Sequence, residues 1–237
     1  MFFLFSGEGT TDLGGCVNTV PFCRGDDYGH GPMTVVVSQI VESRHGYSPL
    51  DVGVCGFVSK TTLTARASEL KALRKSLGLP GKKTPQETRY FYNNARVLSR
   101  IAREIEAEVG DDVVAVFFRD SDGQQSADRG LWDDKLASMY SGFDVEGFER
   151  GVPMIPKPKS EAWVLSALKY GYRDGGLEDR SGNDNSPNSL KKELDAHADG
   201  HLSKNDLVEL VNNRDIDIDQ LQLPSFVAFR NRLEEVM

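Results

Sequence analysis

Six consecutive apolar residues, VVAVFF from Val113 to Phe118, set the narrowest limit on the architecture of this chain. Valine and phenylalanine favour strands, and a strand formed by this segment would have no polar face to expose to water. A strand that is apolar on both faces is typical of a parallel sheet covered by helices on both sides. The segment therefore predicts an α/β fold.

Further segments alternate between strand and helix patterns, the order expected of βαβ units. Apolar residues at helical spacing predict two helices in the middle of the chain, and the second carries its arginines opposite its apolar stripe. Residues 33–42 (MTVVVSQIVE) fit a strand or a buried helix equally well. The remaining predicted strands cover residues 2–6, 50–59 and 151–156, and the predicted helices cover 63–77, 85–109 and 132–140. We expect a mainly parallel sheet with helices on both faces.

Composition divides the chain into three parts. Residues 172–187 are rich in Gly, Asp, Asn and Ser, as loops and linkers are. Two helical patterns and a closing segment with Phe226, Phe229 and Leu233 at core spacing follow. We therefore predict a catalytic domain over residues 1–170, a loop or linker over 171–188, and a helical extension over 189–237 packed on the same domain.

Cysteine usage and hydropathy bear on the compartment. Cys16, Cys23 and Cys55 form no CxxC pair and leave one unpaired, so we expect buried thiols rather than a disulfide framework or a zinc knuckle. No apolar run reaches the roughly 18 residues of a membrane span, and Glu8 follows the apolar start almost at once. We expect a cytoplasmic protein with no membrane partner.

Basic residues are concentrated in one segment of an acidic chain. The formal net charge is −8, yet residues 60–103 hold 11 Lys and Arg against 2 acids. Such a segment indicates either a track for a nucleic-acid backbone or a solvated pair of amphipathic helices, and both interpretations stay open. The residues predicted to bind DNA or RNA are Lys71, Arg74, Lys75, Lys82, Lys83, Arg89 and Arg96.

Acidic residues stand where predicted strands end. Parallel strands end along one edge of a sheet, so acids distant in sequence can converge there. Asp120 and Asp122 are two positions apart and share one face of an extended chain, where their repulsion favours a bound cation. Oxygen ligands favour Mg²⁺ or Mn²⁺, and Glu8 could complete the shell or act as a general base. The alternative for the DSDG sequence is a cap on the following helix.

The motifs SGEGTTD, FFRDSDG and PKPKSEAW together resemble a TOPRIM domain, the catalytic module of topoisomerases, primases and OLD-type nucleases. The resemblance spans roughly residues 1–170 and implies a Rossmann-like sheet. The sequences Glu161-Ala162-Trp163 and Pro224-Ser225-Phe226 are similar to those of small stand-alone TOPRIM-like bacterial proteins.

The resemblance implies a role for each matching residue. Glu8 would be the TOPRIM glutamate, Asp120 and Asp122 the metal-binding DxD, and Glu161 a supporting acid. Lys159, like Lys157, could neutralise a phosphate, or the PKPK sequence could be an exposed turn. Asp12 is expected to cap the first helix or to extend the metal shell. The predicted metal ligands are Glu8, Asp120, Asp122 and Glu161, and the predicted catalytic residues are Glu8, Asp120, Asp122 and Lys159.

The function predicted from these residues is a Mg²⁺- or Mn²⁺-dependent phosphoryl-transfer enzyme, a TOPRIM-type nuclease within a bacterial defence system. Larger nucleases of this type carry an ATPase region, whereas GLPGKKT has the wrong glycine spacing for a P-loop, so any ATPase would be a separate partner. Two alternatives stay open: a non-catalytic interaction protein that retains the fold, and a HAD-like small-molecule phosphatase whose first Asp is the nucleophile.

Overall fold

The computed structural model describes residues 1–76, 86–121 and 132–237, and the side chains of all of these except 71–76 and 86–87. The predicted site residues Lys82, Lys83 and Asp122 lie outside the described residues. The side chains of Lys71, Arg74 and Lys75 lie outside them as well.

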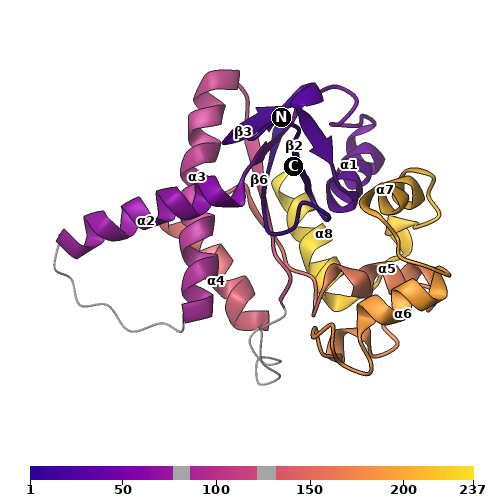
Figure 1. Ribbon diagram of the computed structural model, residues 1–237. Helices are drawn as coiled ribbons and strands as arrows, with labels where there is room; N and C mark the ends of the chain where they lie inside the picture. The colour runs from indigo at the N-terminus through magenta and orange to yellow at the C-terminus, as the bar shows by residue number, and fades with distance from the viewer. Residues whose placement is uncertain (77–85, 122–131) are drawn as a thin grey trace.

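A five-stranded sheet, mostly parallel, forms the centre of the fold (Figure 1). Four strands run parallel, and the short strand at one edge pairs antiparallel with its neighbour. In order across the sheet the strands are β3 (Phe22–Arg24), β5 (Cys55–Val58), β1 (Phe2–Gly7), β6 (Val113–Phe118) and β7 (Gly151–Met154). The α/β class and the mainly parallel sheet are confirmed.

Alternating side chains of the strands face two separate hydrophobic cores. Phe3 and Phe5 of β1 belong to one core, whereas Phe2 and Leu4 belong to the other. Helices cover both faces, on opposite sides of the sheet in Figure 1. One side holds α2 (Lys60–Ser76), α3 (Gln86–Val109) and α4 (Trp132–Val145), and the other holds α1 (Pro32–His45), α5 (Ser160–Leu168) and α8 (Pro224–Val236).

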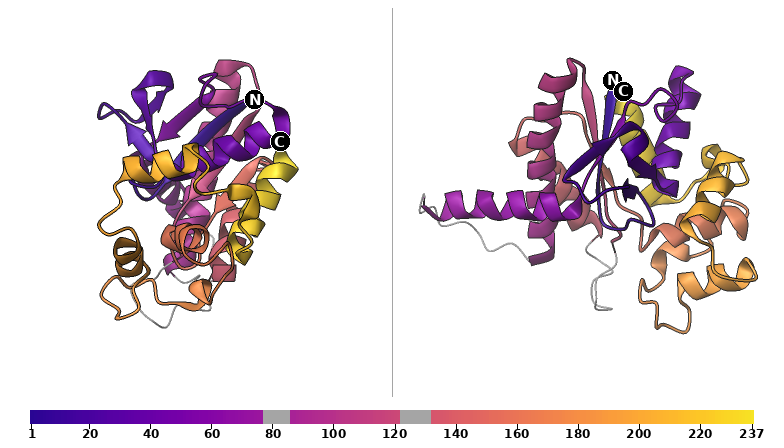
Figure 2. Two further views of the ribbon diagram at one scale, coloured as in Figure 1. Left: turned by 90° about the vertical axis from the view of Figure 1, so that its right-hand side faces the viewer. Right: turned by 45° about the horizontal axis from the view of Figure 1, so that its top comes forward.

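Two further helices, α6 (Leu190–His197) and α7 (Lys204–Asn212), lie on the side of α1 and α5. They contribute Leu194 and Val211 to the same core as Phe3 and Phe5. Helix α2 instead projects away from the sheet, as both Figure 1 and the right view of Figure 2 show. The proposed boundaries at residues 171 and 189 stay a prediction.

Strand β6 begins and ends as predicted, and the ambiguous residues 33–42 are helical. The predicted strand over residues 50–59 is shorter, because a turn that includes Gly53 at φ 70° precedes β5. A small two-stranded sheet of β2 (Gly14–Cys16) and β4 (Tyr28–His30) was not predicted from the sequence. Across the described residues, no helix is long and apolar enough to cross a membrane.

The expectation of three unpaired thiols is wrong for two of them. Cys16 and Cys23 form a disulfide, whereas Cys55 is a free, buried thiol. The bond links β2 to β3, since the chain turns back between these strands and brings the two cysteines together. Spacing alone did not reveal this pairing, because a disulfide depends on where the backbone places the two Cβ atoms.

Candidate active site at the carboxyl edge of the sheet

Loops that follow three strands meet at Ser160, the first residue of α5. Its hydroxyl donates a hydrogen bond to Asp12 Oδ1 at 2.6 Å, and its backbone N–H donates to Asp120 Oδ1 at 3.1 Å. Asp12 lies in the loop after β1, Asp120 lies just beyond β6, and α5 follows β7. The carboxyl edge of the sheet therefore joins residues that are far apart in the sequence, as the strand pattern predicts.

Glycines allow the loop after β1 to approach its neighbours closely. A Cβ atom at Gly7 would lie 2.0 Å from the Phe118 carbonyl oxygen, and one at Gly31 would lie 2.3 Å from the Asp12 carbonyl oxygen. That Asp12 oxygen accepts a hydrogen bond from the Met33 N–H, in the first turn of α1. The expected capping of the first helix by the Asp12 side chain is wrong, because Gly31 is the N-cap of α1 and makes no side-chain hydrogen bond.

Two acids at this turn have raised pKa values. Burial raises the pKa of Asp12, against the hydrogen bonds from Ser160 and Thr11. Burial also raises the pKa of Glu161, and the negative charge of Asp12 adds to the effect, whereas Lys159 opposes it. Two partly desolvated carboxylates that disfavour each other's charge form an environment that a bound cation would stabilise.

Glu8 reaches the same edge but takes two cations as partners. Its Oε1 accepts a hydrogen bond from Lys60 Nζ at 2.7 Å, and its Oε2 lies 3.2 Å from Arg119 Nη2. Burial would raise the pKa of Glu8, but the Lys60 hydrogen bond and the charges of Arg119 and Lys60 lower it overall. The carboxylate of Glu8 therefore stays ionised, which makes it a weak general base.

Arg119 is a feature of this edge that the sequence reasoning did not identify. Its guanidinium lies 3.9 Å from the centre of the Tyr90 ring, a cation–π contact. Its Nη1 is buried and has no hydrogen-bond partner among the described residues. The signal was present in the sequence, because Arg119 comes directly after β6, as Glu8 comes directly after β1.

Of the predicted metal ligands, Glu8, Asp120 and Glu161 are described, and they reach one edge of the sheet without forming one group there. Within residues 1–76, 86–121 and 132–237, no group of three or more His, Cys, Asp or Glu side chains could hold a metal ion. Glu8 pairs with Lys60 and Arg119, Asp120 contacts the first turn of α5, and Glu161 lies within the electrostatic influence of Asp12. The four-ligand set stays a prediction, and so does the second role expected of Asp12, the extension of the metal shell.

Of the residues predicted to bind nucleic acid, only Arg89 and Arg96 have described side chains. Arg89 is exposed. Arg96 donates to Glu146 Oε1 at 2.7 Å, and their side chains are only 12 % and 11 % exposed. This part of the basic segment therefore joins α3 to the turn that follows α4. Three more of the predicted positions fall on the outer half of α2, which projects from the sheet (Figure 1).

The Glu-Ala-Trp and Pro-Ser-Phe sequences meet in the structure. The Trp163 Nε1–H donates to Ser225 Oγ at 2.8 Å, and the Trp163 ring packs edge-on against Phe226 at 5.0 Å. Ser225 donates in turn from its hydroxyl (2.6 Å) and its backbone N–H (2.9 Å) to Glu178 Oε1. Trp163 is a buried core residue, and this network fixes α5, and with it Glu161, against the start of α8.

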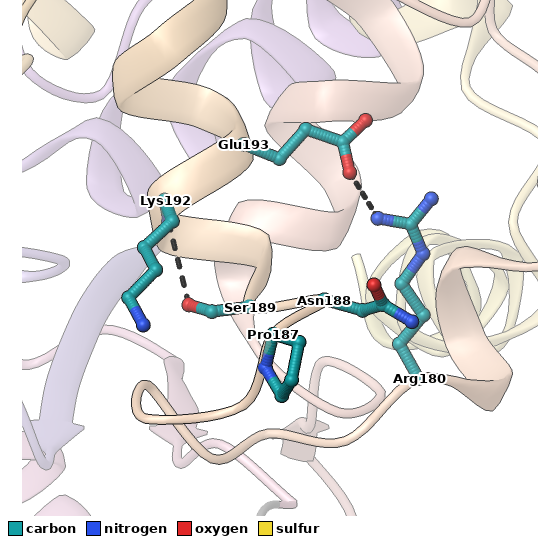
Figure 3. Close-up of a pocket in the computed structure, with 6 residues that line it drawn as sticks. All are labelled: Arg180, Pro187, Asn188, Ser189, Lys192 and Glu193. Atoms are coloured by element: carbon teal, nitrogen blue, oxygen red, sulfur yellow. Dashed lines mark hydrogen bonds and ion pairs between the residues drawn. The ribbon is translucent and has the colours of Figure 1, made fainter.

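Two hollows lie on this side of the sheet. A pocket of about 160 Å³ opens directly beside Ser160 and Glu161. A second hollow lies beyond it, where Figure 3 shows Glu193 directed at Arg180, while Lys192 points away from that pair. Burial would raise the pKa of Glu193, but hydrogen bonds from Lys169, Tyr170 and Arg180 lower it to about 2. The Glu193 carboxylate, which lines the second hollow, is thus engaged by cations of the chain itself.

Comparisons with protein-family models, with curated proteins and with solved structures gave no match to this chain.

Proposed function

We propose that this protein is a Mg²⁺- or Mn²⁺-dependent phosphoryl-transfer enzyme of the TOPRIM type, a nuclease that cleaves phosphodiester bonds. The convergence of Asp12 and Asp120 on Ser160, at the carboxyl ends of parallel strands, is the observation that carries the proposal. The motif resemblance supports the TOPRIM assignment, a place in bacterial defence and a separate ATPase partner.

The side chains at the Ser160 turn fit a hard divalent cation. They offer carboxylate and hydroxyl oxygens, and Mg²⁺ usually takes only one or two carboxylates, completing its shell with waters and substrate phosphate. Asp12 and Asp120 would hold the ion, with Glu161 and Asp122 as further candidates. When bound, the ion would polarise the phosphoryl group and lower the pKa of a coordinated water.

The chain's own groups would hold the metal-binding carboxylates in place and neutralise the charge of the phosphate. Ser160 holds Asp12 and Asp120 through its hydroxyl and its N–H, so both carboxylates are fixed before a substrate arrives. Lys159, whose ammonium lies 3.0 Å from Asp184 Oδ1, is placed to offset charge on a phosphate. Glu8 holds Lys60 and Arg119 at the same edge, where they would attract the phosphate backbone.

A nuclease assay tests the proposal directly. Single- and double-stranded DNA and RNA would be incubated with the protein in Mn²⁺ or Mg²⁺, with the Asp120→Ala variant alongside. We expect metal-dependent cleavage that the variant loses, together with a steep fall in rate as salt increases. Asp26→Ala, which removes an exposed acid outside the site, is the matched control and should cleave normally.

Thermal stability gives a second measurement. A cation at 100 times its dissociation constant stabilises the folded state by about 2.7 kcal/mol. For a chain of this length that raises the melting temperature by roughly 5–10 °C. The shift should be absent in Asp120→Ala; no shift and no cleavage in the wild type would refute the proposal.

One observation favours the alternative of a non-catalytic interaction protein. The Glu8 carboxylate is engaged by two cations of the chain itself, as expected of a structural ion pair. On that interpretation, replacing Lys60 by Met would destabilise the fold, and neither the wild type nor the variant would cleave a phosphodiester bond. A nuclease that loses activity in Lys60→Met while keeping its melting temperature would exclude this alternative.

A further inference from the structure

The 160 Å³ pocket beside Ser160 combines two kinds of surface. Its apolar wall is made by side chains from four helices, Met33 of α1, Val164 of α5, Leu194 of α6 and Leu207 of α7. The polar lining includes Asp12 and Glu161 on the side of the sheet and Lys191 and Lys204 on the side of the C-terminal helices. The helical extension therefore completes a pocket that begins at the candidate active site.

The size of the pocket limits what it can hold. Sites for drug-sized ligands usually measure roughly 300–1,000 Å³, so this pocket suits one small group rather than a stretch of nucleic acid. Pockets that read a single base hold it against aromatic or apolar side chains, and Met33 and Leu207 are apolar side chains of this lining.

The rim carries two lysines, Lys191 and Lys204, together with the acids Asp12, Glu161 and Asp195. Lys191 is exposed and Lys204 is half-buried, and neither forms an ion pair with any residue that the structure describes. Asp195 on the same rim is already paired with His201, at 3.2 Å between Oδ1 and Nδ1. Two lysines without acidic partners beside an apolar pocket complement a nucleoside phosphate.

We propose that this pocket holds the terminal nucleotide of a nucleic-acid strand, with its base against the apolar wall and its phosphate between the Ser160 turn and the lysines of α6 and α7. This inference rests on the proposed function, because it makes the substrate of the same site a strand end. The shared chemistry is a nucleoside phosphate, which could also arrive as a free mononucleotide.

Binding tests the pocket independently of cleavage. Titration calorimetry would measure the affinity of a nucleoside 5′-monophosphate, in Mg²⁺, for the full-length protein. We expect Lys191→Glu to weaken binding about tenfold, since it reverses a charge beside the phosphate. Lys192→Glu is the matched control: it makes the same change one residue along α6, on a side chain that lines the other hollow (Figure 3), and should leave the affinity unchanged.

A second variant fills the pocket itself. Leu207→Trp should abolish monophosphate binding while leaving the binding of inorganic phosphate in place, because only the base competes with the new ring. No binding by the wild type, equal binding of inorganic phosphate and the monophosphate, or equal effects of Lys191→Glu and Lys192→Glu would each overturn the assignment.

Cleavage then identifies the source of the nucleotide. A linear single strand and a closed circle of the same sequence would be compared in Mn²⁺. The proposal requires degradation of the linear strand alone, and cleavage of both at the same rate would overturn it. If the wild type shows neither a metal-dependent melting shift nor Asp120-dependent cleavage, the proposed function is refuted. The calorimetry would then still show whether the pocket binds a nucleoside monophosphate.

Discussion

Replacing Ser225 by Ala should destabilise the fold by about 3 kcal/mol. Ser225, Trp163 and Glu178 are 2 %, 2 % and 6 % exposed, so water cannot replace the hydrogen bonds that the hydroxyl makes. The substitution leaves the Trp163 indole N–H without its acceptor, which costs about 1–3 kcal/mol. Ser225 also donates two hydrogen bonds to Glu178 Oε1, and the substitution removes the one from the hydroxyl. A hydrogen bond to a charged group is worth about 1.5–3 kcal/mol.

The two costs share one hydroxyl and are not fully additive, so the expected total of about 3 kcal/mol lies in the lower part of their summed range of about 2.5–6 kcal/mol. Urea unfolding followed by tryptophan fluorescence measures it, since Trp163 lies inside the network. At roughly 2–4 °C per kcal/mol, the melting temperature should fall by about 6–12 °C.

Ser68→Ala is the control for this measurement. Ser68 is exposed on α2, where its hydroxyl donates only to the Thr64 carbonyl oxygen, so the change should stay within about 0.5 kcal/mol. If Ser225→Ala cost no more than Ser68→Ala, the hydrogen-bond network would not hold α5 against α8, and the positioning of Glu161 would need another cause.

Three further predictions concern the sheet edge and the disulfide. Gly7→Ala should destabilise by about 3 kcal/mol in urea unfolding, because its Cβ would overlap the Phe118 carbonyl oxygen, whereas Gly29→Ala, whose Cβ would be 3.5 Å from its nearest neighbour, should cost far less. Reducing the disulfide, which spans 7 positions, should lower the free energy of unfolding by about 2 kcal/mol, and an unchanged urea midpoint under reductant would contradict its presence. Burial raises the pKa of Asp12 in the folded state, so the stability that its protonated form contributes is complete below about pH 4 and is lost as pH rises through the folded pKa. Without metal, the free energy of unfolding of Asp12→Asn should therefore rise relative to that of the wild type between about pH 4 and pH 7. A constant difference between the two would count against the raised pKa.

The sequence was most informative where one interaction dominated. Strand β6 is apolar throughout and buried throughout, and its bounds followed from that pattern alone. Residues 33–42 stayed ambiguous because α1 is buried continuously from Pro32 to Val41 and so has no polar face to reveal its period. Strands β2, β3 and β4 have three residues each, too few for any period to show.

The candidate site was likewise predictable only in part from the sequence. The positions of acids at strand ends were predictable, because the ends of parallel strands lie on one edge. The partners were not, since Asp12 and Ser160 are 148 residues apart and their contact depends on the path of both loops. The pairing of Glu8 with Lys60 likewise joins residues 52 positions apart, and no local pattern records it.

The carboxylates at this edge occupy two different environments, and the difference assigns their roles. Glu8 is held by two cations that lower its pKa, so it remains an anion and accepts a proton poorly. Asp12 and Glu161 are partly desolvated and have raised pKa values, so they gain most from a metal ion or a proton. Acids whose environments separate their pKa values in this way usually divide the work of a site between them. Within the proposed function, Glu8 therefore suits the positioning of Lys60 and Arg119 for a phosphate better than it suits the role of general base, and the Ser160 turn is where the cation and the proton transfer belong.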